Sequence, residues 1–207
     1  MTIDRRSALR LIGALPVAVG FTFERGEALA AAAKAEKVVK AAAAGKAYQP
    51  KFFNPDEWQL VRVLVDKIIP KDERSGGATD AGVPEFMDFI MNDPTDTDLQ
   101  RERRQTAMRG GLAWLDRECT SRYDKMFVNC TDAERTKVLD EIAWPSKAAP
   151  GISHGVAFFN MFRDLTASGF WTSKMGITDL KYIGNTVVPE WKGCPDEVLK
   201  KLGVQRG

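Results

Sequence analysis

Histidine is the scarcest chemically useful residue in this 207-residue chain: there is one, His154, and there are only three cysteines. Zinc and di-iron sites need several histidine, cysteine or clustered carboxylate ligands, so the usual versions of such sites are excluded. A serine–histidine or cysteine–histidine nucleophile would have to use His154 alone. No Gly-x-Gly-x-x-Gly follows a strand-like run, and no Walker-type loop is present. The sequence therefore argues against an enzyme that binds its own metal, flavin or nucleotide.

A strong charge of either sign is missing as well. Thirty Lys and Arg residues oppose 28 Asp and Glu residues, which leaves a formal charge of +2. Nucleic-acid binders usually concentrate basic residues on one face, and no basic run of that kind occurs here. The apolar fraction of 44% is near the globular average, and the length suits one domain or at most two small ones.

The N-terminal region lacks an apolar run long enough to span a membrane. Residues 11–23 are uncharged, whereas a spanning helix needs about 20 apolar residues. A basic segment with paired Arg5 and Arg6 precedes this run, and glycine and proline interrupt it, which favours a twin-arginine signal peptide over residues 1–30. The triplet at 28–30 (Ala-Leu-Ala) resembles a cleavage site, and the alanine run around it offers several others. The alternative is an amphipathic helix with a chance arginine pair.

The export route has a consequence for cofactors. Twin-arginine export moves proteins that are already folded, commonly because a cofactor was inserted in the cytoplasm. This chain has no cofactor motif, so the cofactor is expected in a partner that travels with it. Residues 31–47 are rich in alanine and lysine and lack a wide apolar stripe. We therefore expect a linker there, outside the core, and a folded domain over residues 48–207.

Apolar residues at three- and four-residue spacing, separated by glycine and proline, predict an all-α domain with irregular loops. Asn54 and Pro55 are typical of a helix start, and Thr131 begins a capping-box pattern. The segment 153–168 is the most apolar and is expected to be central. The other predicted helices cover 84–92, 96–118 and the residues from 131 to 144; the tail from 169 is expected to be loop-rich, with short turns near 178–183 and 196–202.

Two sets of polar residues are candidate chemical sites. His154 begins the most apolar helix, where it is either a general acid or base or a packed capping residue. Asp66, Asp72, Glu73 and Asp80 lie in or near one Gly-rich loop and could hold a divalent cation. Because their spacing matches no regular ligand pattern, a solvated acidic loop is the favoured interpretation.

The three cysteines allow several arrangements. An exported protein can form disulfides, and an odd count leaves one thiol over after any internal pair. Cys119 and Cys130 flank a short connection and could pair with each other. Cys194 is expected in an exposed loop, which makes it the better candidate for an intersubunit disulfide. Buried, unpaired thiols are the alternative for all three.

Aromatic residues concentrate late in the chain. Trp171, Tyr182, Asn185 and Trp191 are expected in loops rather than on helix faces. Tyrosine and tryptophan are enriched at protein interfaces. These residues either cap the core or form a partner surface, and we favour the partner surface because the export argument already requires a partner.

Two segments carry a resemblance to a known family. The first spans residues 60–88 and the second residues 162–195. The motifs are Leu64-Val65-Asp66-Lys67-Ile68-Ile69-Pro70, Ser75-Gly76-Gly77-Ala78, Ala81-Gly82-Val83-Pro84-Glu85-Phe86, Gly169-Phe170-Trp171-Thr172-Ser173, Gly176, Tyr182-Ile183-Gly184-Asn185 and Trp191-Lys192-Gly193-Cys194-Pro195. Together with the twin-arginine start, they resemble the gluconate 2-dehydrogenase subunit 3 family.

The resemblance implies a small subunit of a periplasmic, flavin-dependent sugar or sugar-acid dehydrogenase. Its catalytic partner would be an FAD protein of the glucose-methanol-choline type that lacks an export signal, and a multihaem cytochrome c subunit often completes the complex. Only the export role of Arg5 and Arg6 carries over residue by residue, and no catalytic residue does. Two other hypotheses remain open: a stand-alone periplasmic binding protein, and an exported enzyme that uses His154.

Overall fold

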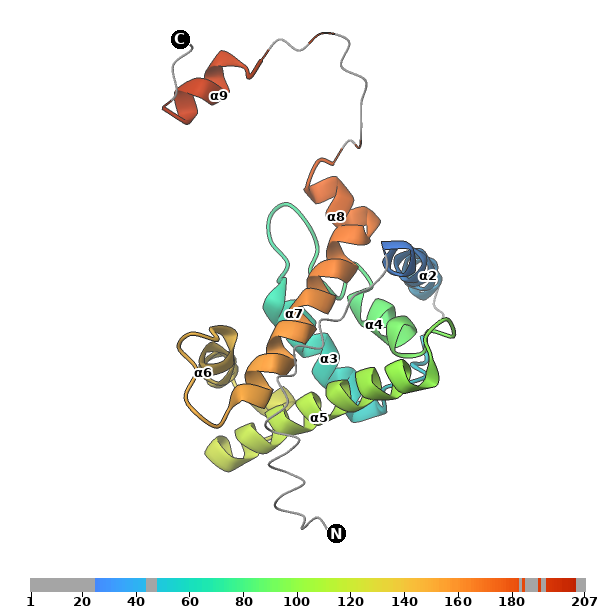
Figure 1. Ribbon diagram of the computed structural model, residues 1–207, viewed down its shortest axis with the longest axis vertical. Helices are drawn as coiled ribbons and strands as arrows, with labels where there is room; N and C mark the ends of the chain where they lie inside the picture. Colours follow the sequence, from blue (N-terminus) through green and yellow to red (C-terminus); the bar gives the residue numbers. More distant parts are fainter. Residues whose placement is uncertain (1–24, 44–47, 183, 185–189, 191–192, 204–207) are drawn as a thin grey trace, which may run out of the picture.

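The computed structural model describes residues 25–43, 48–182, 184, 190 and 193–203, and within these residues it contains helices and no strand (Figure 1). The predicted all-α class is confirmed. In the described ranges, no helix combines the length and apolar character needed to cross a membrane. The elements in chain order are α2 (Arg25–Ala43), α3 (Pro55–Ile68), α4 (Val83–Met91), α5 (Asp98–Tyr123), the 3-10 helix η1 (Phe127–Asn129), α6 (Asp132–Ala143), α7 (Ser153–Thr172), α8 (Lys174–Asp179) and α9 (Asp196–Lys201).

The predicted helix starts are confirmed by their caps. The Asn54 side chain accepts a hydrogen bond from the Glu57 N–H at 2.9 Å, and the Glu57 carboxylate accepts one from the Asn54 N–H at 3.0 Å. Thr131 and Glu134 form the same reciprocal pair at the start of α6. Each capping box satisfies two backbone N–H groups that would otherwise lack partners, and so fixes where the helix begins.

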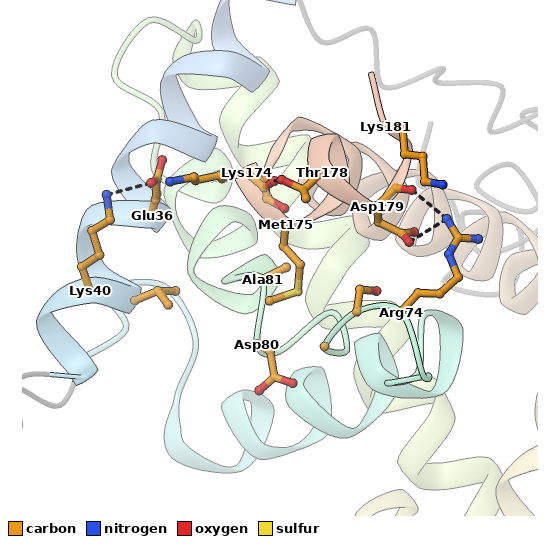
Figure 2. Close-up of a pocket in the computed structure, with 14 residues that line it drawn as sticks. Glu36, Lys40, Arg74, Asp80, Ala81, Lys174, Met175, Thr178, Asp179 and Lys181 are labelled. Carbon is orange, nitrogen blue, oxygen red and sulfur yellow. Dashed lines mark hydrogen bonds and ion pairs between the residues drawn. The ribbon is translucent and has the colours of Figure 1, made fainter. Parts of the chain in front are cut away.

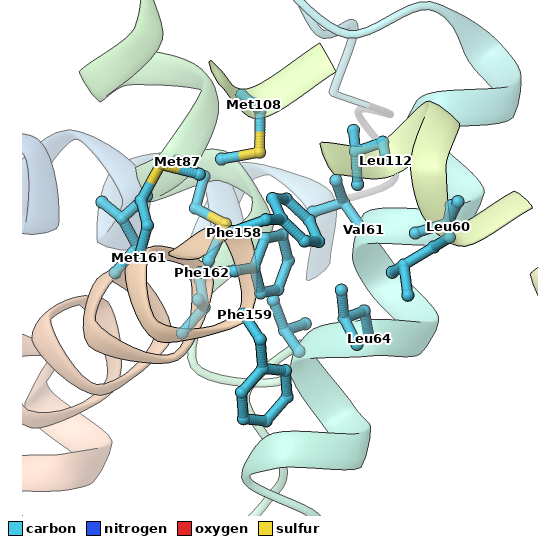
Figure 3. Close-up of a cluster of buried hydrophobic side chains, with 14 of the residues drawn as sticks. Leu60, Val61, Leu64, Met87, Met108, Leu112, Phe158, Phe159, Met161 and Phe162 are labelled. Carbon is cyan, nitrogen blue, oxygen red and sulfur yellow. The ribbon is translucent and has the colours of Figure 1, made fainter. Parts of the chain in front are cut away.

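Helix α7 is the centre of the fold, as its apolar sequence predicts. It packs against α2, α3, α4, α5, α6 and α8. Figure 3 shows its phenylalanine side chains among leucine, valine and methionine side chains of the neighbouring helices. The buried residues drawn there include Leu60, Val61, Leu64, Met87, Met108, Leu112, Phe158, Phe159, Met161 and Phe162.

Two glycines allow α5 and α7 to approach closely. A Cβ atom on Gly111 of α5 would overlap the ring of Phe158 of α7. In the opposite direction, a Cβ atom on Gly155 of α7 would lie 2.6 Å from the Trp114 ring of α5. Gly111 lowers the helix propensity of α5. A larger residue there would push the two helices apart, so the close packing depends on this glycine.

The alanine-rich segment forms a packed helix, so our expectation of a linker outside the core is wrong. Ala28, Ala31, Ala32 and Ala35 are at most 8% exposed and belong to the hydrophobic core. Their spacing of three and four residues places them on one face of α2, which packs against α4 and α7. The stripe is narrow because alanine is small, and a criterion based on large apolar residues does not detect it.

A buried carboxylate fixes the chain between α2 and α3. Asp88 of α4 is fully buried. It accepts hydrogen bonds from the Tyr48 hydroxyl at 2.6 Å, from the Phe52 N–H at 2.8 Å and from the Lys51 N–H at 3.0 Å. Burial, followed by the hydrogen bond to Asp88, raises the pKa of Tyr48 above its ordinary value. Asp88 thereby satisfies backbone N–H groups of the bend that leads into α3.

The C-terminal region is more helical than predicted. Helix α7 continues to Thr172, and α8 follows after Ser173, whose hydroxyl accepts from the Gly176 N–H at 3.1 Å. The placement of Trp171 and Phe170 in a loop is therefore wrong: both lie in the last turn of α7, and Phe170 is buried. The expected turn near 196–202 is confirmed as α9, whose residues are not buried.

Candidate functional site

The loop between α3 and α4 is held by its own carboxylates. Asp72 Oδ1 accepts from the backbone N–H groups of Arg74 and Ser75 at 2.8 and 2.9 Å. Asp66 Oδ1 accepts from the Thr79 N–H at 2.7 Å. The Asp72 bonds have the geometry of an Asx turn, whereas the Asp66 bond links the last turn of α3 to the loop 13 residues later.

The remaining candidates for a cation loop behave in the same way or are exposed. Asp80 Oδ2 accepts from the Gly77 N–H at 3.1 Å, and Glu73 is exposed. In the described part of the chain, no group of three or more His, Cys, Asp or Glu side chains is placed to hold a metal ion.

Glycines bring the two motif segments together. Gly82, with φ +79°, begins α4 in a left-handed conformation that favours glycine. A Cβ atom on Gly169 of α7 would lie 2.8 Å from the Phe86 ring of α4. A Cβ atom on Gly176 of α8 would overlap the backbone carbonyl of Phe170. The glycines in both segments therefore serve close packing of α4, α7 and α8.

An open groove of about 840 Å³ lies where these segments meet α2. Figure 2 shows α2 on one side, the loop after α3 on another, and α8 between them. The lining residues come from three stretches of the chain: Glu36, Val39 and Lys40; Arg74, Ser75, Gly76, Asp80 and Ala81; and Ser173, Lys174, Met175, Thr178, Asp179 and Lys181. Both motif segments thus contribute walls to the groove.

Ion pairs fix the walls of the groove. Arg74 Nη2 lies 2.8 Å from Asp179 Oδ1 and also donates to the Asp179 carbonyl at 2.7 Å, which ties the loop to α8. Within α2, Lys40 Nζ lies 2.8 Å from Glu36 Oε1. The bond from Lys40, aided by the charge of Lys174, lowers the pKa of Glu36. Exposed pairs of this kind add little stability, but together they define the groove's charged rim.

Large apolar side chains are exposed beside the groove. Trp171 is 38% exposed, Ile177 38%, Leu180 56% and Tyr182 60%. We call these four residues the α8 surface. Figure 1 shows α8 at the end of α7 that points toward α9, away from α5 and α6. Exposed apolar groups concentrated in one short stretch are typical of protein interaction sites.

Comparison with known proteins covers the first motif segment and the second as far as residue 189. The model of the gluconate 2-dehydrogenase subunit 3 family matches residues 55–189, about two thirds of the chain. The chain belongs to the gluconate 2-dehydrogenase subunit 3 family. No curated protein and no solved structure matches it.

The structure describes half of the residues that we expected in the partner interface of this subunit 3 protein. Trp171 and Tyr182 are exposed on the α8 surface. Asn185 and Trp191 lie outside the described residues, as do Arg5 and Arg6 of the export signal. We did not predict Ile177 and Leu180. The sequence feature that could have identified them is the three-residue spacing of these apolar side chains after Ser173, a residue type that begins helices.

His154 lies at the opposite end of α7 from the α8 surface. Eighteen residues separate it from Thr172, which corresponds to about 27 Å along a helix. Its ring packs edge-on against Trp114 at a centroid distance of 5.6 Å. His154 itself is exposed, in the first turn of α7, and this ring contact is the one that the structure gives it.

The cysteines of this subunit 3 protein fall into two environments. Cys119 and Cys130 are buried free thiols, and they lie close enough to share a hydrogen bond. Burial, followed by that bond, raises the pKa of Cys119 to about 12, which keeps it in the unreactive thiol form. Cys194 is exposed, as predicted.

Proposed function

We propose that this chain is the non-catalytic small subunit of a periplasmic, flavin-dependent sugar or sugar-acid dehydrogenase complex. It binds the catalytic FAD subunit of the glucose-methanol-choline type in the cytoplasm, carries it through twin-arginine export and stabilises it afterwards. The flavin belongs to that partner, and haem c belongs to a third, cytochrome subunit that passes electrons onward. Membership of the subunit 3 family supports an accessory role in a dehydrogenase complex.

The observation that carries the proposal is the convergence of the family segments at one end of the molecule. Residues of both segments line the groove, and the α8 surface lies beside it. Covering the exposed tryptophan, tyrosine, leucine and isoleucine by a partner would stabilise both chains, because a ligand that binds only the folded state shifts the folding equilibrium. Cys194, exposed further along the chain, is the proposed attachment point for an intersubunit disulfide.

The export role is tested by changing Arg5 and Arg6 together to lysine. The twin-arginine route reads the pair, so the catalytic subunit should remain in the cytoplasm with this chain. Fractionation followed by an assay of flavin-dependent dehydrogenase activity measures the outcome. Normal delivery of the catalytic subunit to the periplasm by the double variant would refute the carrier role.

The docking role of the α8 surface is tested with a matched pair of leucines. Leu180 on that surface and Leu99 at the start of α5 are both 56% exposed. Loss of one buried leucine from an interface corresponds to about 2 kcal/mol, or about 30-fold in affinity. Leu180→Gln should weaken capture of the flavoprotein by about that factor, whereas Leu99→Gln should leave it unchanged. Equal capture by both variants would show that the partner binds elsewhere.

A further inference from the structure

Helix α2 precedes the residues that the family model matches, and its packing bears on how the export signal is processed. Four alanines on one face, at positions 28, 31, 32 and 35, are between 2% and 8% exposed. The Ala-Leu-Ala triplet that resembles a cleavage site, residues 28–30, lies inside this helix. Cleavage after Ala30 would therefore cut a packed element.

The contacts of α2 are specific. A Cβ atom on Gly82 would lie 2.7 Å from Val39 Cγ2 and 3.5 Å from Ala35 Cβ, so the helix crosses close to the start of α4. Glu36 forms an ion pair with Lys40, and Figure 2 shows Lys174 of α8 near it. The charge of Lys174 helps to lower the pKa of Glu36. Helix α2 thus packs on the core and forms one wall of the groove.

Cleavage after Ala30 would place a new charge in an unfavourable position. Ala31 is 3% exposed, and the cut would convert its amide nitrogen into a positively charged amine. That amine would be the first group of the shortened helix, where the helix dipole is already positive. A positive charge at this end of a helix is unfavourable, and the cut would also remove Ala28 from the core.

The packing also limits access by a peptidase. A protease binds its substrate as an extended segment, so a bond within a docked helix is cut only when that helix opens. Because the twin-arginine route carries folded proteins, α2 would already be docked before the leader meets a peptidase. This argument rests on the proposed export function.

We propose that α2 is a permanent part of the exported protein and that the leader is removed, if at all, before Arg25. Within residues 1–24, Ala18-Val19-Gly20 is the triplet with Ala, Gly or Ser at both its first and third positions. Small residues at these positions are what a signal peptidase reads. The new N-terminus would then be Phe21.

The processing claim is tested by intact mass measurement and N-terminal peptide sequencing of the chain from the periplasmic fraction. We expect a chain that begins at Phe21, and any N-terminus from Met1 to Arg25 supports the inference. A periplasmic chain that begins between residues 26 and 44 would overturn it, because α2 would then be lost or cut.

The docking of α2 is tested in the full chain by a measurement that does not depend on export. Ala35 is 2% exposed, whereas Ala33 lies on the exposed face of the same helix. We expect Ala35→Leu to lower the thermal midpoint by several degrees or to prevent folding, with Ala33→Leu unchanged to within about one degree. Equal midpoints would overturn the inference. A chain that is never exported would refute the carrier function but leave this comparison valid.

Discussion

Adding one methyl group at Gly111 tests the packing of the two longest helices. The Cβ of Gly111→Ala would overlap the ring of Phe158, which is 5% exposed and already packs against Phe162 at a centroid distance of 5.6 Å. Overpacking of this kind costs about 1–3 kcal/mol, and we take the upper value because the ring has little room to move. The gain in helix propensity is about 1 kcal/mol. The net loss of folding stability is therefore about 2 kcal/mol.

The neighbouring glycine supplies the control. A Cβ atom on Gly110 would meet nothing within 4 Å, so Gly110→Ala retains only the gain in propensity, about 1 kcal/mol. For a chain of this length, thermal unfolding should show a midpoint about 4–8 °C lower for Gly111→Ala and about 2–4 °C higher for Gly110→Ala. If Gly111→Ala were as stable as Gly110→Ala, the described crossing of α5 and α7 would be incorrect.

Three further predictions concern buried polar groups and thiols. Asp88→Asn replaces a carboxylate that only accepts hydrogen bonds with an amide that also donates, and should lower the free energy of unfolding, measured by urea titration, by about 3 kcal/mol. The control, Asp164→Asn, removes an exposed ion pair and should change that free energy by less than about 0.5 kcal/mol. Burial raises the pKa of Glu85, so just above pH 4.5 the folded state binds more protons than the unfolded state, and folding stability falls as the pH rises through that range. Glu85→Gln should therefore be more stable than the wild type at pH 7 and equally stable near pH 4. A stability gain of the same size at both pH values would contradict this. In the reduced, folded protein, a thiol reagent should modify Cys194 quickly and Cys119 only after unfolding. Mass spectrometry of labelled peptides measures both rates. Rapid labelling of Cys119 would disprove its burial.

The sequence predicts the helix boundaries best where local chemistry determines them. Asn54 and Thr131 define their helix starts because a side chain and a backbone N–H only three residues apart form the cap. The central position of α7 also follows from its sequence, since a helix with phenylalanines on several faces must be covered on several faces.

Features that depend on distant parts of the chain are harder to predict. Helix α2 is recognised as part of the core from its packing against α4 and α7, because alanine packs well where another helix comes close. Asp88 is one of two acidic residues in an otherwise apolar helix, and its four hydrogen-bond donors lie 35 to 40 residues earlier in the sequence.

The candidate site was predicted only in part, because one of its features depends on residue type and the other on contacts between distant parts of the chain. Exposed aromatic residues such as Trp171 and Tyr182 can be selected by type, since leaving them in water is unfavourable. The groove cannot be selected in this way. It lies between a loop and a short helix that are 105 residues apart in the sequence and that the Arg74–Asp179 pair links.

The most direct test of the account is to isolate this chain from its own cells in mild detergent, with a tag at its C-terminus. We predict a yellow complex with flavin absorbance that contains a second chain of flavoprotein size. If Cys194 forms the intersubunit disulfide, the two chains will separate in a denaturing gel only after a reductant is added. A colourless, monodisperse monomer without a bound chain would contradict the accessory-subunit role and would favour a stand-alone binding protein.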